Sequence, residues 1–179
     1  MAAAVLVALG AITGCGDGES EAPPTTRTPN FDWVKGPTRE FIIPGGDNAV
    51  QLFGREATAA ERKEASRVIH GWMRARAAAD WDKDCSYMSR AYRKILVDDA
   101  AAVSKGKATT CPAALEYFGP AASGDLVNNL IGPIDSLRVE KGQAYAQYHG
   151  RGGVDWIVPM DRENGRWRVA IATPINRKR

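Results

Sequence analysis

Histidine and cysteine are scarce in this sequence, and their scarcity limits the chemistry that the chain can carry. Only two histidines, His70 and His149, and three cysteines occur among its 179 residues. No Cys or His pair has the spacing of a zinc site, and two distant histidines make a poor one. The stretch "DRENG" (161–165) lacks the ligand spacing and the final Glu of a calcium loop. We therefore expect neither a metal ion nor another cofactor.

Signatures of common enzymes are missing as well. No serine lies in a G-x-S-x-G motif, which excludes that form of nucleophilic catalysis. The stretch "GRGG" (150–153) has glycines in the manner of a phosphate loop. It lacks the Lys-Ser/Thr ending, however, and it precedes a strand-like run rather than a helix. It therefore predicts a hairpin turn. His70 is predicted on the flank of a helix and His149 at the end of a strand.

An excess of basic charge is also absent. The formal net charge of +3 equals the charge of the last three residues, Arg177, Lys178 and Arg179, so the rest of the chain sums to zero. A nucleic-acid groove needs a clustered basic surface, and we therefore expect no nucleic-acid partner. The basic tail is predicted to be a frayed, solvated end. A weak contact with an anionic lipid or polymer is the alternative.

No apolar run is long enough to cross a bilayer as a helix. The longest, "AAAVLVALGA" (2–11), has ten residues and suits the apolar core of a signal peptide. The residues "ITGC" (12–15) that follow resemble the lipobox of bacterial lipoproteins. This resemblance implies cleavage before Cys15 and acylation of its thiol, which would attach the protein to a membrane. No Lys or Arg precedes the run, unlike in a usual export signal, and an accidental apolar leader is the alternative.

The remaining two cysteines fit an exported protein. If Cys15 carries lipid, Cys85 and Cys111 are left as a pair, and an oxidising compartment would close them into a disulfide. Two unpaired buried thiols are the alternative. We expect a signal peptide over 1–14, a flexible Pro-, Gly- and Thr-rich tether over 15–38 and one domain over 39–179. The transitional residues 31–48, with the strand-like run "REFII" and the turn cluster "PGGDN", are expected to lie across this domain as an edge strand. The predicted location is the extracytoplasmic face of a bacterial cell envelope.

Helices are predicted in the first half of this domain. Thr58 and Glu61 have capping-box spacing, and they precede a helix that is expected to end near Asp80. Shorter helices are expected within 81–96 and 111–119. The long helix has an apolar stripe at steps of three and four residues: Ala65, Val68, Ile69, Trp72, Ala75 and Ala79. The charged residues mainly fall off this stripe and are predicted to form a solvated face: Glu61, Arg62, Lys63, Arg67 and Arg74.

From residue 134 onward, apolar residues recur at every second position instead of every third or fourth. The runs "IDSLRVE", "QAYAQYH", "VDWIVPM" and "RWRVAIA" predict four antiparallel strands, and Asn164-Gly165 predicts a tight type I′ hairpin. One sheet face should pack on the long helix: Leu137, Val139, Ala144, Ala146, Tyr148, Val154, Trp156, Val158, Trp167, Val169 and Ile171. The other face should be mixed and polar: Arg138, Tyr145, Gln147, His149, Asp155, Ile157, Arg166 and Arg168. Helices followed by strands indicate an α+β fold.

This order of elements resembles the NTF2-like superfamily of cone-shaped domains, over roughly residues 56–175. The resemblance is based on the long helix ending in "ARAAADWDKDC", the shorter helices and a curved antiparallel sheet ending in "GRWRVA". The superfamily includes isomerases and cyclases as well as non-catalytic binding domains. Its isomerases use an Asp base with a Tyr and a protonated Asp. Residues of these types occur here without a matching motif: Tyr87, Tyr117, Tyr145, Tyr148, Asp135 and Asp155.

Four aromatic residues are candidates for the lining of a ligand cavity: Trp72, Tyr148, Trp156 and Trp167. The alternative is that they form core, where aromatic side chains dominate packing. The sequence favours a lipid-anchored domain that binds a small apolar ligand or a protein partner without catalysis. A ketosteroid-isomerase- or cyclase-like enzyme with a carboxylate in the cone is the alternative. A homodimer through the polar sheet face is a third interpretation.

Overall fold

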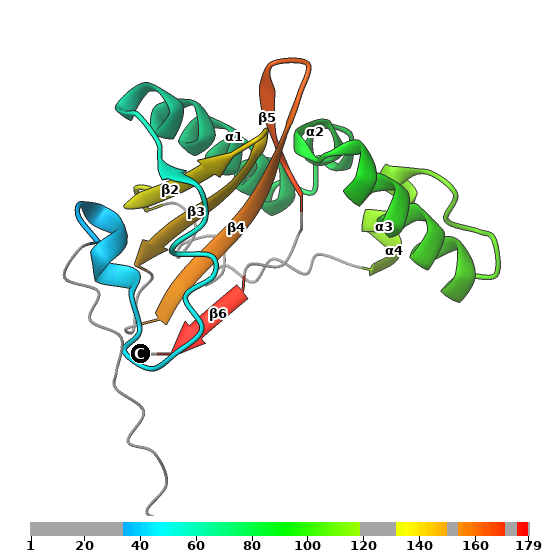
Figure 1. The fold of residues 1–179 in the computed structure, drawn as a ribbon. Helices are drawn as coiled ribbons and strands as arrows, with labels where there is room; N and C mark the ends of the chain where they lie inside the picture. Colours follow the sequence, from blue (N-terminus) through cyan, green and yellow to red (C-terminus); the bar gives the residue numbers. More distant parts are fainter. Residues whose placement is uncertain (1–33, 119–131, 150–153, 171–174, 179) are drawn as a thin grey trace, which may run out of the picture.

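The computed structural model describes residues 34–118, 132–149, 154–170 and 175–178 (Figure 1). The predicted signal peptide, Cys15, most of the tether and the "GRGG" turn lie outside the described residues. The helical elements are η1 (Pro37–Phe41), α1 (Ala59–Ala77), α2 (Trp81–Tyr87), α3 (Arg90–Val103) and α4 (Cys111–Phe118). The strands are β1 (Arg55–Glu56), β2 (Ser136–Glu140), β3 (Gln143–His149), β4 (Val154–Glu163), β5 (Arg166–Val169) and β6 (Ile175–Lys178).

The strands form one antiparallel sheet in the order β1-β2-β3-β4-β5, and β6 pairs with the first half of β4, whereas β5 pairs with its second half. The α+β class and the meander of β2 to β5 are thus confirmed. The Asn164-Gly165 hairpin is also confirmed, because both residues have the positive φ values, 49° and 76°, of a type I′ turn. The prediction for the basic tail is wrong. Arg177 pairs with Asp155 in register as part of β6, rather than belonging to a frayed end.

The long helix begins and packs as its sequence predicts. The Thr58 hydroxyl accepts from the backbone N–H of Glu61, while the Glu61 carboxylate accepts from the backbone N–H of Thr58. Arg55 donates two hydrogen bonds to the same carboxylate, at 3.0 and 2.8 Å. The Arg55 guanidinium and the Thr58 N–H lower the pKa of Glu61 to about 2. Both interactions favour the ionised carboxylate, and the positive end of the helix dipole stabilises it as well.

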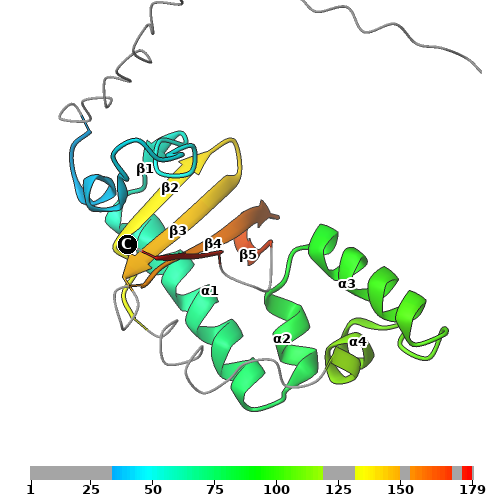
Figure 2. The same ribbon diagram turned by 90° about the horizontal axis from the view of Figure 1, so that it is seen from below.

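The predicted inner face of the sheet packs on α1, which lies across it (Figures 1 and 2). The alternation that places residues on this face therefore holds wherever the side chains are described. The stripe on α1 is wrong only at Ala79, which is exposed and follows the end of the helix. The shared core contains Ala57, Ala65, Ile69, Trp72, Met73, Leu137, Val139, Ala144, Ala146, Tyr148, Val158, Met160, Trp167 and Val169.

The short helices form a second, smaller core at one end of the molecule. The predicted disulfide between Cys85 and Cys111 is present, with 6.1 Å between the Cα atoms, and it joins α2 to the first residue of α4. Figures 1 and 2 show α3 and α4 projecting beyond the sheet. The backbone N–H of Ser89, between α2 and α3, donates to the carbonyl of Val169 at 2.8 Å. This bond holds the helical end against β5.

Residues 34–54, which we call the N-terminal strap, cover the second face of the sheet. Figure 1 shows the strap (blue to cyan) on the opposite side of the sheet from α1. The Phe41 ring stacks on His149 with 4.3 Å between centroids, and the Thr38 hydroxyl lies 2.8 Å from that of Ser136. Gln147 and Ile157, predicted on a mixed polar face, are 0% and 1% exposed under this cover.

The strap changes two expectations. Val34 and Thr38, which were predicted to belong to the flexible tether, are buried, so the packed part of the chain includes residues before the predicted boundary at Arg39. The second sheet face is also not the open polar surface that its sequence suggests. A homodimer on this face stays a prediction, and it would form over the strap rather than on bare strands.

Candidate functional site

Three of the four aromatic residues predicted to line a cavity are fully packed. Trp72, Tyr148 and Trp167 are 0%, 1% and 2% exposed in the core between α1 and the sheet, and Trp156 packs against this core. Tyr148 and Trp156 are partners across β3 and β4. The Tyr148 hydroxyl and the Trp156 N–H have no hydrogen-bond partner among the described residues, and burial raises the pKa of Tyr148. The structure thus brings the four rings together, and Trp167 also lines a surface cleft.

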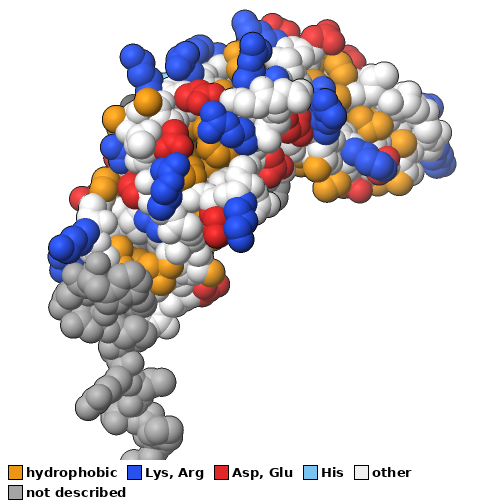
Figure 3. Space-filling view, turned by 45° about the horizontal axis from the view of Figure 1, so that its top comes forward, with side chains coloured by type: hydrophobic (Ala, Val, Ile, Leu, Met, Phe, Trp, Pro, Cys, Tyr) orange, Lys and Arg blue, Asp and Glu red, His pale blue; other side chains and the backbone are white. Residues whose placement is uncertain are grey.

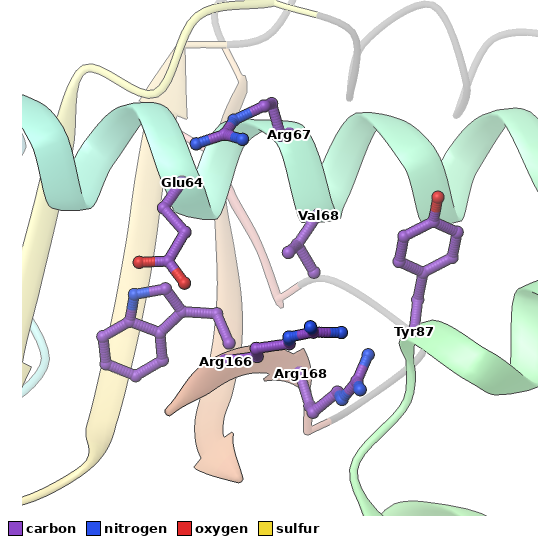
Figure 4. Close-up of a pocket in the computed structure, with 7 residues that line it drawn as sticks. Glu64, Arg67, Val68, Tyr87, Arg166 and Arg168 are labelled. Carbon is purple, nitrogen blue, oxygen red and sulfur yellow. The ribbon is translucent and has the colours of Figure 1, made fainter. Parts of the chain in front are cut away.

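This cleft lies between α1, the end of α2 and β5, and has a volume of about 420 Å³ (Figure 4). Residues three and four positions apart on a helix share a face, which is how α1 presents several side chains to it. The edge strand β5 supplies three consecutive residues. The lining consists of Glu64, Arg67, Val68, Tyr87, Arg166, Trp167 and Arg168. Sequence reasoning assigned Arg67 to a solvated helix face and the two β5 arginines to a sheet face, and missed that they meet.

The charges of the cleft are unevenly paired. Arg67, Arg166 and Arg168 have no acidic partner within ion-pair distance among the described residues, and Glu64 is the only acidic group of the lining. Its carboxylate lies 3.8 Å from the guanidinium of Arg162, which is outside the cleft. Figure 3 shows that Lys and Arg side chains are widespread on one face of the molecule, with acidic and apolar side chains between them. The cleft gathers three arginines around one aliphatic and two aromatic side chains, Val68, Tyr87 and Trp167.

Two contacts define the α2 side of the cleft. Arg168 donates from Nη1 to the carbonyl of Ser86 at 2.7 Å, in the last turn of α2. The Tyr87 ring packs directly on α1 at Gly71, where an added Cβ would lie 2.8 Å from the ring carbon Cε1. Because Gly71 has no side chain, the Tyr87 ring can lie against α1 and form one side of the cleft. Tyr87 also lines a smaller depression of about 210 Å³ between α1 and α2.

A buried ion pair supports the junction of α1 and α2. Arg76 Nε donates to Asp84 Oδ2 at 2.8 Å, and the two side chains are 7% and 0% exposed. The Arg76 guanidinium also lies over the Trp72 ring, 4.9 Å from its centroid. Burial raises the pKa of Asp84, and the Arg76 guanidinium opposes that rise. Neither residue was a candidate from the sequence, because charged residues on a helix usually indicate a solvated face.

His149 is the centre of a second polar cluster, beneath the strap. Its Nδ1 lies 2.8 Å from Asp155 Oδ1, and its Nε2 lies 3.2 Å from Glu40 Oε2 in η1. Its backbone N–H donates to the carboxylate of Asp135 at 2.9 Å. As predicted, His149 ends a strand, and these contacts fasten the strap to the sheet. His70 lies in α1, as predicted, with its Nε2 3.1 Å from the carbonyl of Gly132.

The residues of isomerase type do not form one site. Tyr148 is in the core, whereas Tyr145 is on the opposite sheet face and contacts Phe53. Tyr87 lines the cleft, and Tyr117 is exposed on α4 with its hydroxyl 3.3 Å from the carbonyl of Val103. The two aspartates contact His149 instead of a tyrosine: Asp135 and Asp155.

Within the described ranges, no group of three or more His, Cys, Asp or Glu side chains is placed to hold a metal ion. None of the helices described there is both long and apolar enough to cross a membrane. Comparisons with models of protein families, with curated proteins and with solved structures found no match to this chain.

Proposed function

We propose that this chain is a non-catalytic binding domain, lipid-anchored through Cys15 to the outer face of a bacterial membrane, and that the arginine-lined cleft holds its small-molecule ligand. The observation that carries the proposal is the cleft: three arginines without a described acidic partner surround apolar side chains in about 420 Å³. This volume lies within the range of known small-molecule sites. The "ITGC" sequence at 12–15 supports the anchor.

We also propose that the fold is an NTF2-like cone. The long helix α1 lies on one face of an antiparallel sheet, and shorter helices separate it from the strands in sequence, which supports this assignment. The cleft lies beside the packed core rather than inside it. A ligand that binds there contacts α1, α2 and β5 without displacing core side chains.

The alternative is a small isomerase or cyclase, which needs an accessible carboxylate with a raised pKa in an apolar cavity. Asp84 is the described carboxyl group whose pKa is raised, but it is 0% exposed and its two oxygens face Arg76. The carboxylate in the cleft, Glu64, lies beside Arg162. Binding without catalysis therefore fits these positions better than proton transfer does.

Native mass spectrometry of the full-length protein purified from its original host tests this proposal. The expected result is a bound small molecule of defined mass that is released by collisional activation. Val68→Trp fills the cleft and should abolish the bound mass. Val103→Trp adds the same ring at a 58% exposed position on α3 and should leave it unchanged. A protein without a bound molecule, or a Val68→Trp variant that retains it, contradicts the proposal.

A further inference from the structure

We infer that the ligand of the cleft is an organic anion, a carboxylate or phosphate attached to a flat apolar body. This inference rests on the proposed function, because it names the chemical class of the molecule that the cleft would bind. It depends on three features of the lining: its charge balance, the positions of its guanidinium groups and its apolar surface.

The charge balance of the lining is positive. Three guanidinium groups and one carboxylate line the cleft, and the carboxylate of Glu64 is directed toward Arg162. A positive cleft with low-dielectric walls concentrates anions from solution. Positive charge alone does not distinguish the cleft. A wide depression on α3 has the same balance, with Arg90, Arg93 and Lys94 against Asp98, but its lining contains no aromatic side chain.

The arginines of the lining come from two elements. Arg166 and Arg168, two residues apart on β5, extend from the strand toward Val68 (Figure 4). Arg67 lines the cleft from α1, where its Nε donates to the carbonyl of Lys63 at 3.4 Å. The contact of Arg168 with the carbonyl of Ser86 fixes one of its nitrogens and leaves the others for a ligand. Guanidinium groups bind carboxylates and phosphates through paired hydrogen bonds, which recognise an oxyanion rather than a point charge.

The apolar part of the lining favours a flat body. Val68 and Tyr87 are half-buried, so each has surface left for a ligand, and Trp167 also lines the cleft. Figure 4 shows Tyr87 on the α2 side of the cleft, with Val68 pointing from α1 toward β5. A planar ring system can lie against these side chains while its anionic group meets the arginines, as aromatic groups commonly pack in ligand sites.

Probes of the same shape but different charge separate the contribution of charge to the affinity from the contribution of apolar contact. Isothermal titration of the full-length protein compares 2-naphthoate with 2-naphthamide, which keeps the ring system and loses the negative charge. We expect 2-naphthoate to bind about tenfold or more tightly than the amide. Its affinity should fall several-fold when the salt concentration rises from 20 to 300 mM, because salt screens exposed charges. A third probe, 2-naphthyl phosphate, distinguishes a phosphate preference from a carboxylate preference, and either one supports the inference.

Variants assign the charge effect to the cleft. Arg166→Gln and Arg168→Gln should each weaken 2-naphthoate binding several-fold and leave 2-naphthamide binding unchanged. Arg93→Gln, on α3 and outside the cleft, is the matched control and should change neither affinity. An unchanged 2-naphthoate affinity in both cleft variants overturns the inference.

The failure of the inference can be told apart from the failure of the proposed function. Equal binding of 2-naphthoate and 2-naphthamide, abolished by Val68→Trp, means that the cleft binds ligands without selecting anions. That result keeps the proposed function and overturns the inference. Failure of all three probes to bind overturns the inference, and together with an empty protein in native mass spectrometry it also overturns the proposed function.

Discussion

Removal of the Cys85–Cys111 disulfide tests how the helical end of the molecule is held together. The bridge closes a loop with a sequence separation of 26 residues. In the chain-entropy model, a loop of this length lowers the entropy of the unfolded chain enough to contribute about 3.5 kcal/mol at 25 °C. The core that it reinforces is small. Its buried members are Cys85, Met88, Leu96, Ala100, Ala108, Ala114 and Leu115, and Cys111 packs against them partly buried.

We therefore expect the free energy of unfolding of the double variant Cys85→Ser/Cys111→Ser to be about 3.5 kcal/mol lower than that of the parent. This loss corresponds to a Tm lower by roughly 10 °C. Urea denaturation measures the first quantity and calorimetry the second. Dithiothreitol provides the matched control, because it should destabilise the parent by a similar amount and leave the variant unchanged. A loss below about 1 kcal/mol, or maleimide labelling of both cysteines in the unreduced parent, would refute this reasoning.

Three further perturbations have expected outcomes. Glu61→Gln should remove about 1 kcal/mol of stability at neutral pH, because Arg55 then loses its anionic partner. The folded-state pKa of about 2 lies below the ordinary 4.5, so this stabilisation is present above about pH 4.5 and is lost as the pH falls toward 2. Urea titrations at several pH values should show a weaker acid dependence in the variant, and an identical dependence would contradict the assignment. Asp84→Asn should cost about 3–5 kcal/mol, because the charge of Arg76 stays buried without a counter-charge. A loss near zero in urea denaturation would mean that the pair is not buried in solution. Cys15→Ser should move the protein from the membrane fraction to the soluble fraction in cell fractionation, and continued firm membrane attachment would contradict the proposed anchor.

The local elements could be predicted because their determinants are close together in the sequence. The cap formed by Thr58 and Glu61 and the apolar stripe that follows are readable without knowledge of any partner. The same is true of the Asn164-Gly165 turn, whose conformation is set by two residues. The disulfide followed from the count of cysteines in an expected oxidising compartment, which is a chemical rather than a geometric argument.

Residues 31–48 were expected to lie across the domain, but as an edge strand, whereas Pro37–Phe41 form a short helix. The burial of the polar sheet face and the last strand could not be predicted, because polar residues usually indicate a solvated surface. Gln147 is 0% exposed, yet its place in an alternating strand favours solvent. Its burial depends on residues about a hundred positions earlier in the chain, which carry no periodic signal. Arg177 is part of a basic run typical of a frayed end, and only its pairing with β4 makes it a strand residue.

The cleft was missed for a related reason. Arg67 follows the charged side of α1, and Arg166 and Arg168 alternate on the far side of β5, so each pattern by itself indicates solvent. Their meeting depends on how α1 crosses an edge strand that is about a hundred residues away in sequence. The position of Tyr87 in turn depends on Gly71, whose missing side chain has no evident role in a helix until the ring beside it is known.

The central claim is that an anionic small molecule binds in the cleft between α1, α2 and β5. NMR of the arginine Nε–H groups in the full-length protein, recorded as 2-naphthoate is added, tests it most directly. The account predicts saturable shifts for Arg67, Arg166 and Arg168, with the signals of Arg93 and Arg74 unchanged. Absence of shifts at the three cleft arginines, or equal shifts at all five, would contradict it.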